Sequence, residues 1–257
     1  MRSLRARILA GDRVIGTFLK TPDPHMVELL GLAGLDFIVA DSEHAPIDLG
    51  ALDLMAMAGR SVSLPILFRA RGHDPAMISP GFDAGVTGVM VPHVRTAQNA
   101  ERIADAVKYA RGRRGFSPSG RAGGYGTMKP ADYRMRSDET SLFMAQIEDE
   151  DALNHLDAIA GQGDVDVLFV GPADLSLSMG IAPDDPKMAR AIDDVVAAAR
   201  RAGIAAGLFV GGNGAEVEAW AARGVSVFVC GSDQSLLLGA ARQLCATARP
   251  ANERKNP

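Results

Sequence analysis

The sequence predicts an α/β protein that folds as a single (β/α)₈ barrel, or TIM barrel. Two observations predict this fold. The chain has 257 residues, a length that suits one such barrel, and eight apolar runs alternate with helical patterns. A doubly wound open sheet is the alternative, because a count of strands does not show that the sheet closes.

Eight short runs rich in apolar and β-branched residues have the length and composition of buried parallel strands. Turn residues and a helical pattern follow each run, as in successive βα units. The runs are residues 14–19, 37–41, 66–69, 88–92, 142–148, 167–171, 205–209 and 227–230.

The helical stretches between these runs carry their own start and stop signals. Asp23, followed by proline, is expected to begin the first, and Thr96 to begin the fourth. Gly203 and Gly224 are expected to end the sixth and seventh, because glycine adopts the left-handed conformation that often terminates a helix.

One domain is expected over residues 1–248, and the polar, proline-bounded segment 249–257 is expected to be a disordered tail. The longest stretch without periodicity, residues 111–130, falls between the fourth and fifth strands. There a barrel places a loop of the catalytic face, so we expect this stretch to form a lid or a subunit contact.

Composition favours a small-molecule partner. The net charge of −4 and the pI near 5.7 argue against a nucleic acid or an acidic membrane surface as a partner. No leader peptide or membrane-spanning stretch is evident, so a cytoplasmic location is expected. Cys230 and Cys245 lack the spacing of a metal or redox motif and are expected to be reduced thiols in the core.

Two carboxylates, Glu148 and Asp174, lie at or just past the ends of the fifth and sixth runs. The carboxyl ends of neighbouring parallel strands meet at one edge of a sheet, so these oxygen atoms could converge on a hard divalent cation. Mg²⁺ or Mn²⁺ fits best, with Co²⁺ and Zn²⁺ as further candidates, because two protein ligands leave room for a chelating substrate. Helix capping is the alternative role of both carboxylates.

Three more polar residues follow strands that would end at the same mouth. Arg69 would stabilise the enolate of a 2-oxo acid bound to the cation, and its alternative role is a structural salt bridge. His44 follows Asp41 by three residues, so the carboxylate could orient the imidazole as a general base. A loop histidine satisfied by its own turn is the alternative.

Three motifs make the sequence resemble the HpcH/HpaI aldolase family over nearly the whole chain. They are D-x-E-H at residues 41–44, Q-I-E at residues 146–148 and G-P-x-D-L at residues 171–175. The resemblance implies a (β/α)₈ barrel, often a homohexamer, that uses a divalent metal to cleave or form 4-hydroxy-2-oxo acids through a pyruvate enolate.

Matched to the family, Glu148 and Asp174 are the implied metal ligands, and Arg69 is the implied enolate-stabilising arginine. Asp41 and His44 match the dyad that assists proton transfer. The positions that hold pyruvate match Gln146, Gly171, Pro172 and Ala173.

Two further positions bear on the second substrate. Asp83 resembles a residue that reaches the site of a neighbouring subunit. Several relatives carry tryptophan where this chain has Phe18, so the aldehyde pocket is expected to differ in shape.

The functional hypothesis is therefore a divalent-metal-dependent aldolase that reversibly cleaves a 4-hydroxy-2-oxo acid to pyruvate and an aldehyde. Oxaloacetate decarboxylation would be a side activity, because it passes through the same enolate. Two alternatives stay open: a CoA-ester lyase of the citrate lyase β or malyl-CoA lyase type, and a non-catalytic barrel that binds a 2-oxo acid.

Overall fold

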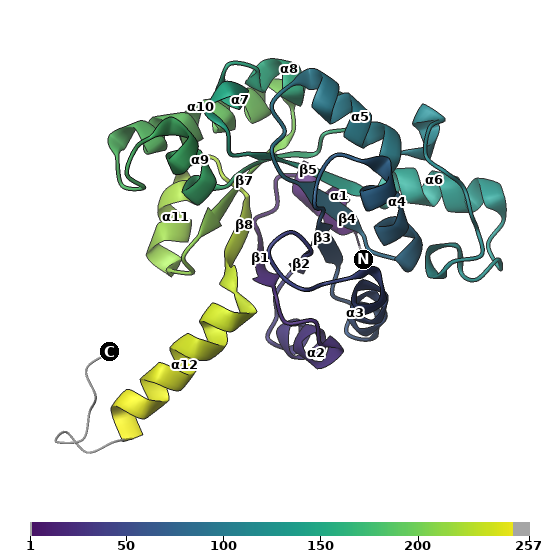
Figure 1. Ribbon diagram of the computed structural model, residues 1–257, viewed down its shortest axis with the longest axis horizontal. Coiled ribbons are helices and arrows are strands. Elements are labelled where there is room, and N and C mark those ends of the chain that lie inside the picture. The colour runs from purple at the N-terminus through teal and green to yellow at the C-terminus, as the bar shows by residue number, and fades with distance from the viewer. Residues whose placement is uncertain (1, 249–257) are drawn as a thin grey trace.

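The computed structural model describes residues 2–248 and confirms the predicted barrel (Figure 1). The eight strands are parallel and pair in sequence order, and β8 pairs back with β1, so the open-sheet alternative is wrong. The predicted tail, residues 249–257, lies outside the described residues. The strands are β1 (Val14–Leu19), β2 (Phe37–Asp41), β3 (Ile66–Arg69), β4 (Gly88–Val91), β5 (Leu142–Ile147), β6 (Val167–Val170), β7 (Ala205–Val210) and β8 (Val227–Ser232).

Helices follow the strands and surround the sheet, and α1 precedes it (Figure 1). The helices are α1 (Leu4–Leu9), α2 (Pro24–Leu32), α3 (Leu49–Ser61), α4 (Pro75–Ala84), α5 (Ala97–Val107), α6 (Pro130–Thr140), α7 (Glu150–Leu153), α8 (Leu156–Ala160), α9 (Pro172–Met179), α10 (Pro186–Ala202), α11 (Gly214–Ala222) and α12 (Asp233–Ala248), with the 3₁₀ turns η1 (Tyr109–Arg111) and η2 (Arg121–Gly123).

The predicted helix signals are confirmed. The Asp23 side chain accepts a hydrogen bond from the His25 N–H at the start of α2, and Thr96 caps α5 in the same way. Gly203 follows α10 with φ +71°, the left-handed conformation that glycine tolerates without steric cost.

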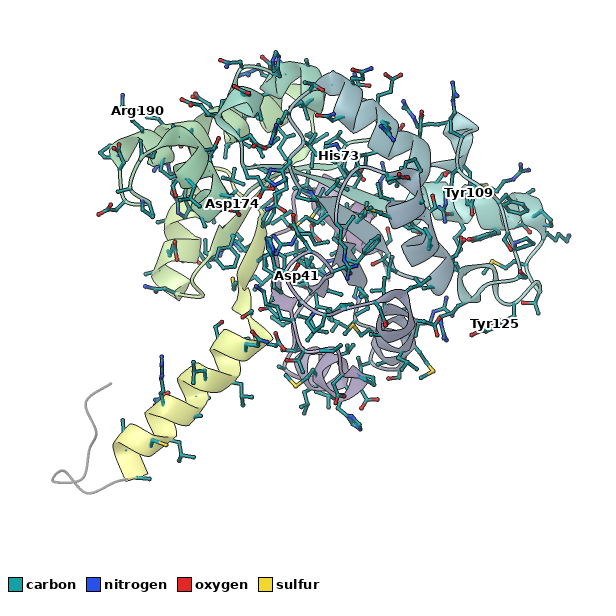
Figure 2. The ribbon with its side chains drawn as sticks, in the orientation of Figure 1. Asp41, His73, Tyr109, Tyr125, Asp174 and Arg190 are labelled. Atoms are coloured by element: carbon teal, nitrogen blue, oxygen red, sulfur yellow. The ribbon has the colours of Figure 1, made fainter. Side chains whose placement is uncertain are left out.

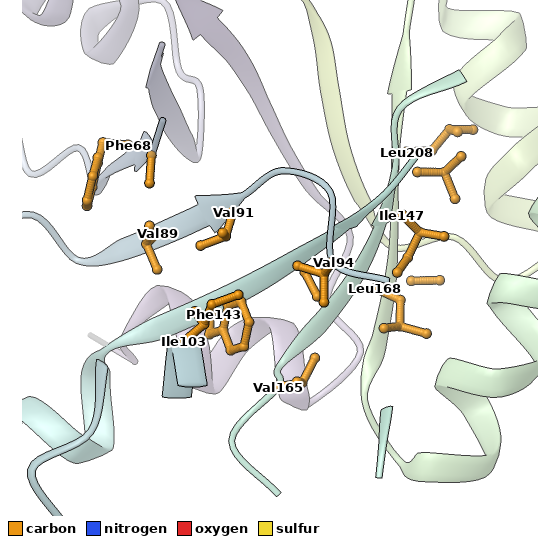
Figure 3. Packing of buried hydrophobic residues seen from close by; sticks show 14 of the residues in the cluster. Phe68, Val89, Val91, Val94, Ile103, Phe143, Ile147, Val165, Leu168 and Leu208 are labelled. Atoms are coloured by element: carbon orange, nitrogen blue, oxygen red, sulfur yellow. The ribbon is translucent and has the colours of Figure 1, made fainter. Parts of the chain in front are cut away.

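Buried side chains form two layers, one inside the barrel and one between the sheet and its helices. The inner layer includes Phe37 and Phe169, and Leu4 and Ile8 of α1 belong to the same cluster. Gly16 makes room for this packing, because a Cβ there would lie 2.7 Å from the Phe37 ring. The outer layer is seen in Figure 3, where residues such as Phe143 of β5 pack with the helices.

The alternation of side chains along each strand explains why polar groups gather at the mouth. Phe37 and Val39 belong to the inner cluster, so Asp41 continues the inward-facing set. Leu67 puts Arg69 on the inner face in the same way, and the register pairs Asp41 with Arg69 directly. The fold therefore brings distant charged residues to one end of the barrel.

The prediction for residues 111–130 as a catalytic-face lid is wrong. This segment follows α5, so the chain has already returned along the outside of the barrel when it begins. It packs on the neighbouring helices: Arg121 pairs with Asp53 of α3 at 2.7 Å, and Arg60 donates to the Arg121 carbonyl at 3.2 Å. None of its residues lines the mouth cavity described below. Its role as a subunit contact stays a prediction.

The last helix, α12, extends away from the barrel (Figure 1). Every residue from Gln234 to Ala248 is exposed, and only Asp233 at the start is buried. Cys245 lies on this helix and is exposed, so its predicted place in the core is wrong, whereas Cys230 is partly buried. Across residues 2–248, the helices are all too short or too polar to cross a membrane.

Candidate active site

A cavity of about 290 Å³ opens at the C-terminal ends of the strands, where Asp41 and Asp174 are labelled in Figure 2. Active sites of this fold lie at that end. Most of the predicted site residues line the cavity, namely Phe18, His44, Arg69, Gln146, Gly171, Pro172, Ala173 and Asp174.

Arg69 and Asp41 form a buried bidentate ion pair. Arg69 Nε and one terminal nitrogen donate to the two Asp41 oxygens at 2.9 and 2.6 Å, and Asp41 is fully buried. Burial alone would raise the pKa of Asp41, but the hydrogen bonds and charge of Arg69 lower it below its ordinary value of 3.8. Arg69 therefore forms the structural salt bridge that was its alternative role. The same guanidinium also faces the cavity.

Asp41 orients the loop that carries His44 and does not contact the imidazole, contrary to prediction. Its Oδ1 accepts hydrogen bonds from the backbone N–H groups of Glu43 and His44, at 3.2 and 3.1 Å. The imidazole Nε2 lies 3.6 Å from Glu43 Oε2, and Glu43 also lies 3.3 Å from Arg69 Nε. Glu43 is thus a member of the polar cluster that sequence reasoning missed, although it lies inside the D-x-E-H motif.

Glu148 is buried immediately behind the cavity wall. One of its oxygens accepts from the Gln146 amide, and the other accepts from the His93 backbone N–H at 2.9 Å. Burial raises the pKa of Glu148 to about 7, and the charge of Asp174 adds to this effect. The fold therefore holds a carboxylate where its charge is poorly solvated.

The helix-capping alternative is wrong for Glu148, whereas Asp174 does lie at a helix start, although it is not the N-cap. Helix α7 begins at Glu150 with Asp149 as its N-cap, so Glu148 stands before the cap. Gly171 is the N-cap of α9, and Asp174 lies in the first helical turn, where the N-terminal dipole favours negative charge.

His93 contacts Glu148, and it is a member of the site that the sequence did not single out. Its Nδ1 lies 3.0 Å from Asp149 Oδ2 and 3.5 Å from Glu148 Oε1. Burial would lower the pKa of His93, but the Asp149 hydrogen bond and both carboxylates raise it. Its left-handed backbone, φ +55°, points the N–H at Glu148, and no motif in the sequence signals that conformation.

The donor set fits a hard divalent cation with open coordination positions. Glu148 and Asp174 supply carboxylate oxygens, and Gln146 Oε1 is a buried acceptor with no hydrogen-bond partner. Within residues 2–248, no group of three or more His, Cys, Asp or Glu side chains is placed to hold a metal. A cation here would depend on oxygen atoms from the substrate or water for the rest of its coordination.

Of the two positions predicted to bear on the second substrate, Phe18 lines the cavity and Asp83 does not. The Phe18 ring lies in the cavity wall, 4.5 Å from the Arg69 guanidinium carbon. Asp83 lies on α4 and does not line the cavity; its nearest cation is Arg114, at 3.5 Å, and burial raises its pKa. The predicted reach of Asp83 toward a neighbouring subunit stays a prediction.

A second cavity of about 290 Å³ lies at the other end of the barrel, between α3, α4 and α6. Its walls are mainly apolar, with Arg60 and Arg136 among the charged residues. None of the predicted site residues lines it, so the chemistry belongs to the cavity at the mouth.

Comparison with known proteins agrees with this geometry. A family model described as HpcH/HpaI aldolase/citrate lyase matches residues 14–240. The chain belongs to the HpcH/HpaI aldolase/citrate lyase family.

Two relatives and one solved structure illustrate the similarity. The chain is 33% identical to the 2-dehydro-3,6-dideoxy-6-sulfogluconate aldolase of Pseudomonas putida over 90% of both chains. It is 35% identical to the hydroxypyruvate/pyruvate aldolase of Pseudomonas aeruginosa, covering 93% of this chain and 90% of that one. A crystal structure of a family member from Burkholderia cenocepacia superimposes with a TM-score of 0.90 at 28% identity, covering 96% of this chain and 99% of the other.

These relatives are aldolases, enzymes that break and form carbon–carbon bonds. The chain is accordingly an enzyme of the carbon–carbon lyase class, and the reading as a non-catalytic barrel is set aside.

Proposed function

We propose that this protein is a divalent-metal-dependent aldolase that reversibly cleaves a 4-hydroxy-2-oxo acid to pyruvate and an aldehyde. One observation carries the proposal: buried Glu148 and the unpaired Gln146 amide oxygen lie beside Asp174 at the mouth that Arg69 also faces. Sugar-acid-type substrates are favoured, since the relative from Pseudomonas putida is named for a sulfogluconate derivative.

Glu148 and Asp174 are proposed to hold the cation, which when bound would act as a Lewis acid on the 2-oxo group. Mg²⁺ or Mn²⁺ suits these oxygen donors. The pyruvate half would lie against Gln146 and residues 171–173 of the cavity wall, with its carboxylate toward the backbone N–H of Ala173 at the start of α9 and away from the unpaired Gln146 Oε1.

Arg69 would stabilise the negative charge that develops on the enolate oxygen after carbon–carbon cleavage. Its pairing with Asp41 fixes the guanidinium, so little reorganisation is needed when that charge appears. His44, exposed at the mouth, would take the proton of the C4 hydroxyl, and Asp41 would hold the His44 backbone in place.

The test follows pyruvate alone in D₂O with Mg²⁺ or Mn²⁺, because exchange of its methyl protons reports enolate formation without any aldehyde. Wild-type protein should catalyse exchange that EDTA abolishes, and Glu148→Gln and Asp174→Asn should each lose it while the barrel still folds. Glu150→Gln is the matched control, an exposed glutamate two residues from Glu148. Full metal-dependent exchange by either site variant would contradict the metal assignment.

The alternative reading as a CoA-ester lyase is less well supported, because the reported relatives are aldolases acting on free acids. Malyl-CoA and citramalyl-CoA, assayed beside pyruvate and a panel of aldehydes, separate the two activities.

We also propose that the protein forms a homo-oligomer, a hexamer by family resemblance, in which α12 contacts another subunit. Support comes from the exposed leucines of α12, including Leu237 and Leu244, one heptad apart on the same face of the helix. Replacing both by aspartate should lower the mass measured by light scattering, and an unchanged mass would exclude α12 from the interface.

A further inference from the structure

We propose that His73 and His93 are positioning residues for Glu148, and that they act through the peptide group that joins Pro92 to His93. The inference rests on the proposed function, because it concerns the carboxylate that would hold the cation. It starts from the loop of residues 92–96, which connects β4 to α5 and is hydrogen-bonded to the end of β5.

The Pro92–His93 peptide group bridges His73 and Glu148. His73 Nε2 lies 2.7 Å from the Pro92 carbonyl oxygen, which can only accept, so this nitrogen donates. The N–H of the same peptide group donates to Glu148 Oε1 at 2.9 Å. A hydrogen bond at the carbonyl polarises the peptide group and strengthens its N–H as a donor. His73, which follows β3 and is labelled in Figure 2, therefore reaches Glu148 through one peptide group.

The backbone at His93 is left-handed, which points this N–H at the carboxylate. Its φ of +55° is uncommon for a residue other than glycine. The imidazole supports the conformation, because its Nδ1 lies 3.0 Å from Asp149 Oδ2, and Arg95 pairs with the other Asp149 oxygen at 2.9 Å. The Val94 N–H donates to the Gln146 carbonyl at 3.2 Å, which ties the next residue of the loop to β5. Contacts on both sides of His93 thus hold its backbone in place.

These contacts orient Glu148 and leave it free to bind a cation. A carboxylate offers about four lone-pair positions on its two oxygens. The His93 N–H uses one on Oε1, and the Gln146 amide uses one on Oε2, so the directions of the remaining lone pairs are fixed by two donors from the protein. Groups that orient a metal ligand typically change the metal affinity by about 10- to 100-fold when they are removed.

The two histidines act behind the metal ligand, and neither is counted among the donors to the cation. Among the described residues, neither His73 nor His93 lines the mouth cavity. No third His, Cys, Asp or Glu side chain within residues 2–248 joins Glu148 and Asp174 in a group placed to hold a metal. A loss of metal binding in a His73 variant would therefore be transmitted through the peptide group.

The experiment measures Mn²⁺ binding to the full-length protein by titration calorimetry. His73→Leu removes the donor to the Pro92 carbonyl and should weaken binding by about tenfold. His73→Gln, whose amide nitrogen can replace Nε2 as the donor, should recover most of the affinity. His155→Leu is the matched control, because His155 is exposed and its side chain makes no capping hydrogen bond; it should bind Mn²⁺ as the wild type does.

Substitutions at His93 test the backbone conformation. His93→Val cannot become left-handed without strain, so it should weaken Mn²⁺ binding by about 10- to 100-fold. His93→Asn tolerates that conformation and can still donate to Asp149, so its affinity should stay near that of the wild type. If His93→Val does not fold, His93→Gly replaces it: glycine keeps the left-handed backbone but loses the Asp149 contact, and it should bind Mn²⁺ more weakly than His93→Asn does.

Thermal unfolding in EDTA and in Mn²⁺ separates positioning from a merely structural role. Positioning predicts that His73→Leu melts near the wild-type temperature in EDTA and gains less on addition of Mn²⁺. A lower melting temperature in EDTA with unchanged Mn²⁺ affinity would overturn the proposal. Wild-type affinity in His73→Leu or in His93→Val would overturn the role of that histidine.

Glu148→Gln distinguishes this failure from failure of the proposed function. If the wild type binds Mn²⁺, Glu148→Gln does not, and the histidine variants bind normally, only the positioning role is wrong. If the wild type does not bind Mn²⁺, or Glu148→Gln binds it equally well, the metal assignment itself is wrong and the positioning role is overturned with it.

Discussion

Gly171→Ala probes whether Glu148 and Gln146 must keep their positions for the site to work. Gly171 follows β6, and its backbone is in an ordinary extended conformation, so alanine adds no backbone strain. A methyl group there would lie 2.9 Å from Gln146 Nε2 and 3.0 Å from Glu148 Oε2. The perturbation is thus confined to one buried contact behind the cavity wall.

The size of the effect follows from these distances. Ordinary contact begins near 3.4 Å, so the amide and the carboxylate must give way by roughly half an ångström. Site geometry has to hold within about 0.5 Å, so we expect divalent-metal affinity to fall by about 10- to 100-fold and turnover by a similar factor. Overpacking should also cost about 1–3 kcal/mol of unfolding free energy.

Titration calorimetry with Mn²⁺ measures the affinity, and urea unfolding measures the stability. Gly163→Ala is the matched control: it lies before β6, Gly171 lies after it, and a Cβ at residue 163 meets no atom within 4 Å. The control should bind Mn²⁺ as the wild type does. Wild-type affinity and turnover in Gly171→Ala would refute the reasoning that Glu148 reaches the cation from its position beside Gln146.

Three further outcomes are expected. Asp41→Asn should lose up to about 3–5 kcal/mol of unfolding free energy at pH 7, because it removes the carboxylate of the bidentate pair and leaves buried Arg69 only Glu43, 3.3 Å from its Nε. The pKa of Asp41 is lowered on folding, so its stabilisation is complete above the unfolded value of 3.8 and is lost as the pH falls through the lower folded value. Urea unfolding should show the same difference between the two proteins at pH 7 and pH 5, and a shrinking difference as the pH is taken well below 3.8. Arg69→Lys keeps a positive charge beside Asp41 but cannot form the bidentate fork, so it should reduce turnover by about 100-fold or more and lower the melting temperature less than Asp41→Asn does; near-normal turnover would exclude Arg69 from the chemistry. Phe18→Leu should change the ranking of aldehydes in a competition assay while pyruvate exchange stays at the wild-type rate, and a parallel loss of exchange would place Phe18 with Arg69 instead.

The strands and the charged residues at their ends were predictable because both depend on local pattern. Asp41 and Arg69 continue the alternation of inward-facing residues, and the register pairs them directly. Helix starts such as Thr96 were predictable for the same reason, since a cap and the N–H it accepts are three residues apart. Patterns of this kind need no knowledge of distant packing.

The predictions that were wrong and the contacts that were not predicted depend mostly on packing between distant parts of the chain. His93 reaches Glu148 across the neighbouring strands β4 and β5, through a backbone conformation that the sequence does not signal. The exposed position of α12 is likewise set by what the helix packs against, because its apolar residues would suit a buried helix equally well. Residues 111–130 were misplaced for another reason: a helix starting at Thr96 already places this segment after α5, away from the mouth.

Asp233 belongs both to the mouth of the barrel and to helix α12. Its carboxylate fixes the Lys20 and Thr21 backbone at the mouth, and it is also the first residue of α12, whose remaining length is exposed. If α12 contacts another subunit, that contact acts on a helix whose first residue is anchored to the Lys20 and Thr21 N–H groups. Assembly and the side of the cavity lined by Phe18 and Lys20 are then coupled through one buried carboxylate. Substitutions on the exposed face of α12 should consequently affect acceptor preference more than pyruvate exchange, although they lie far from the carbon–carbon bond that is broken.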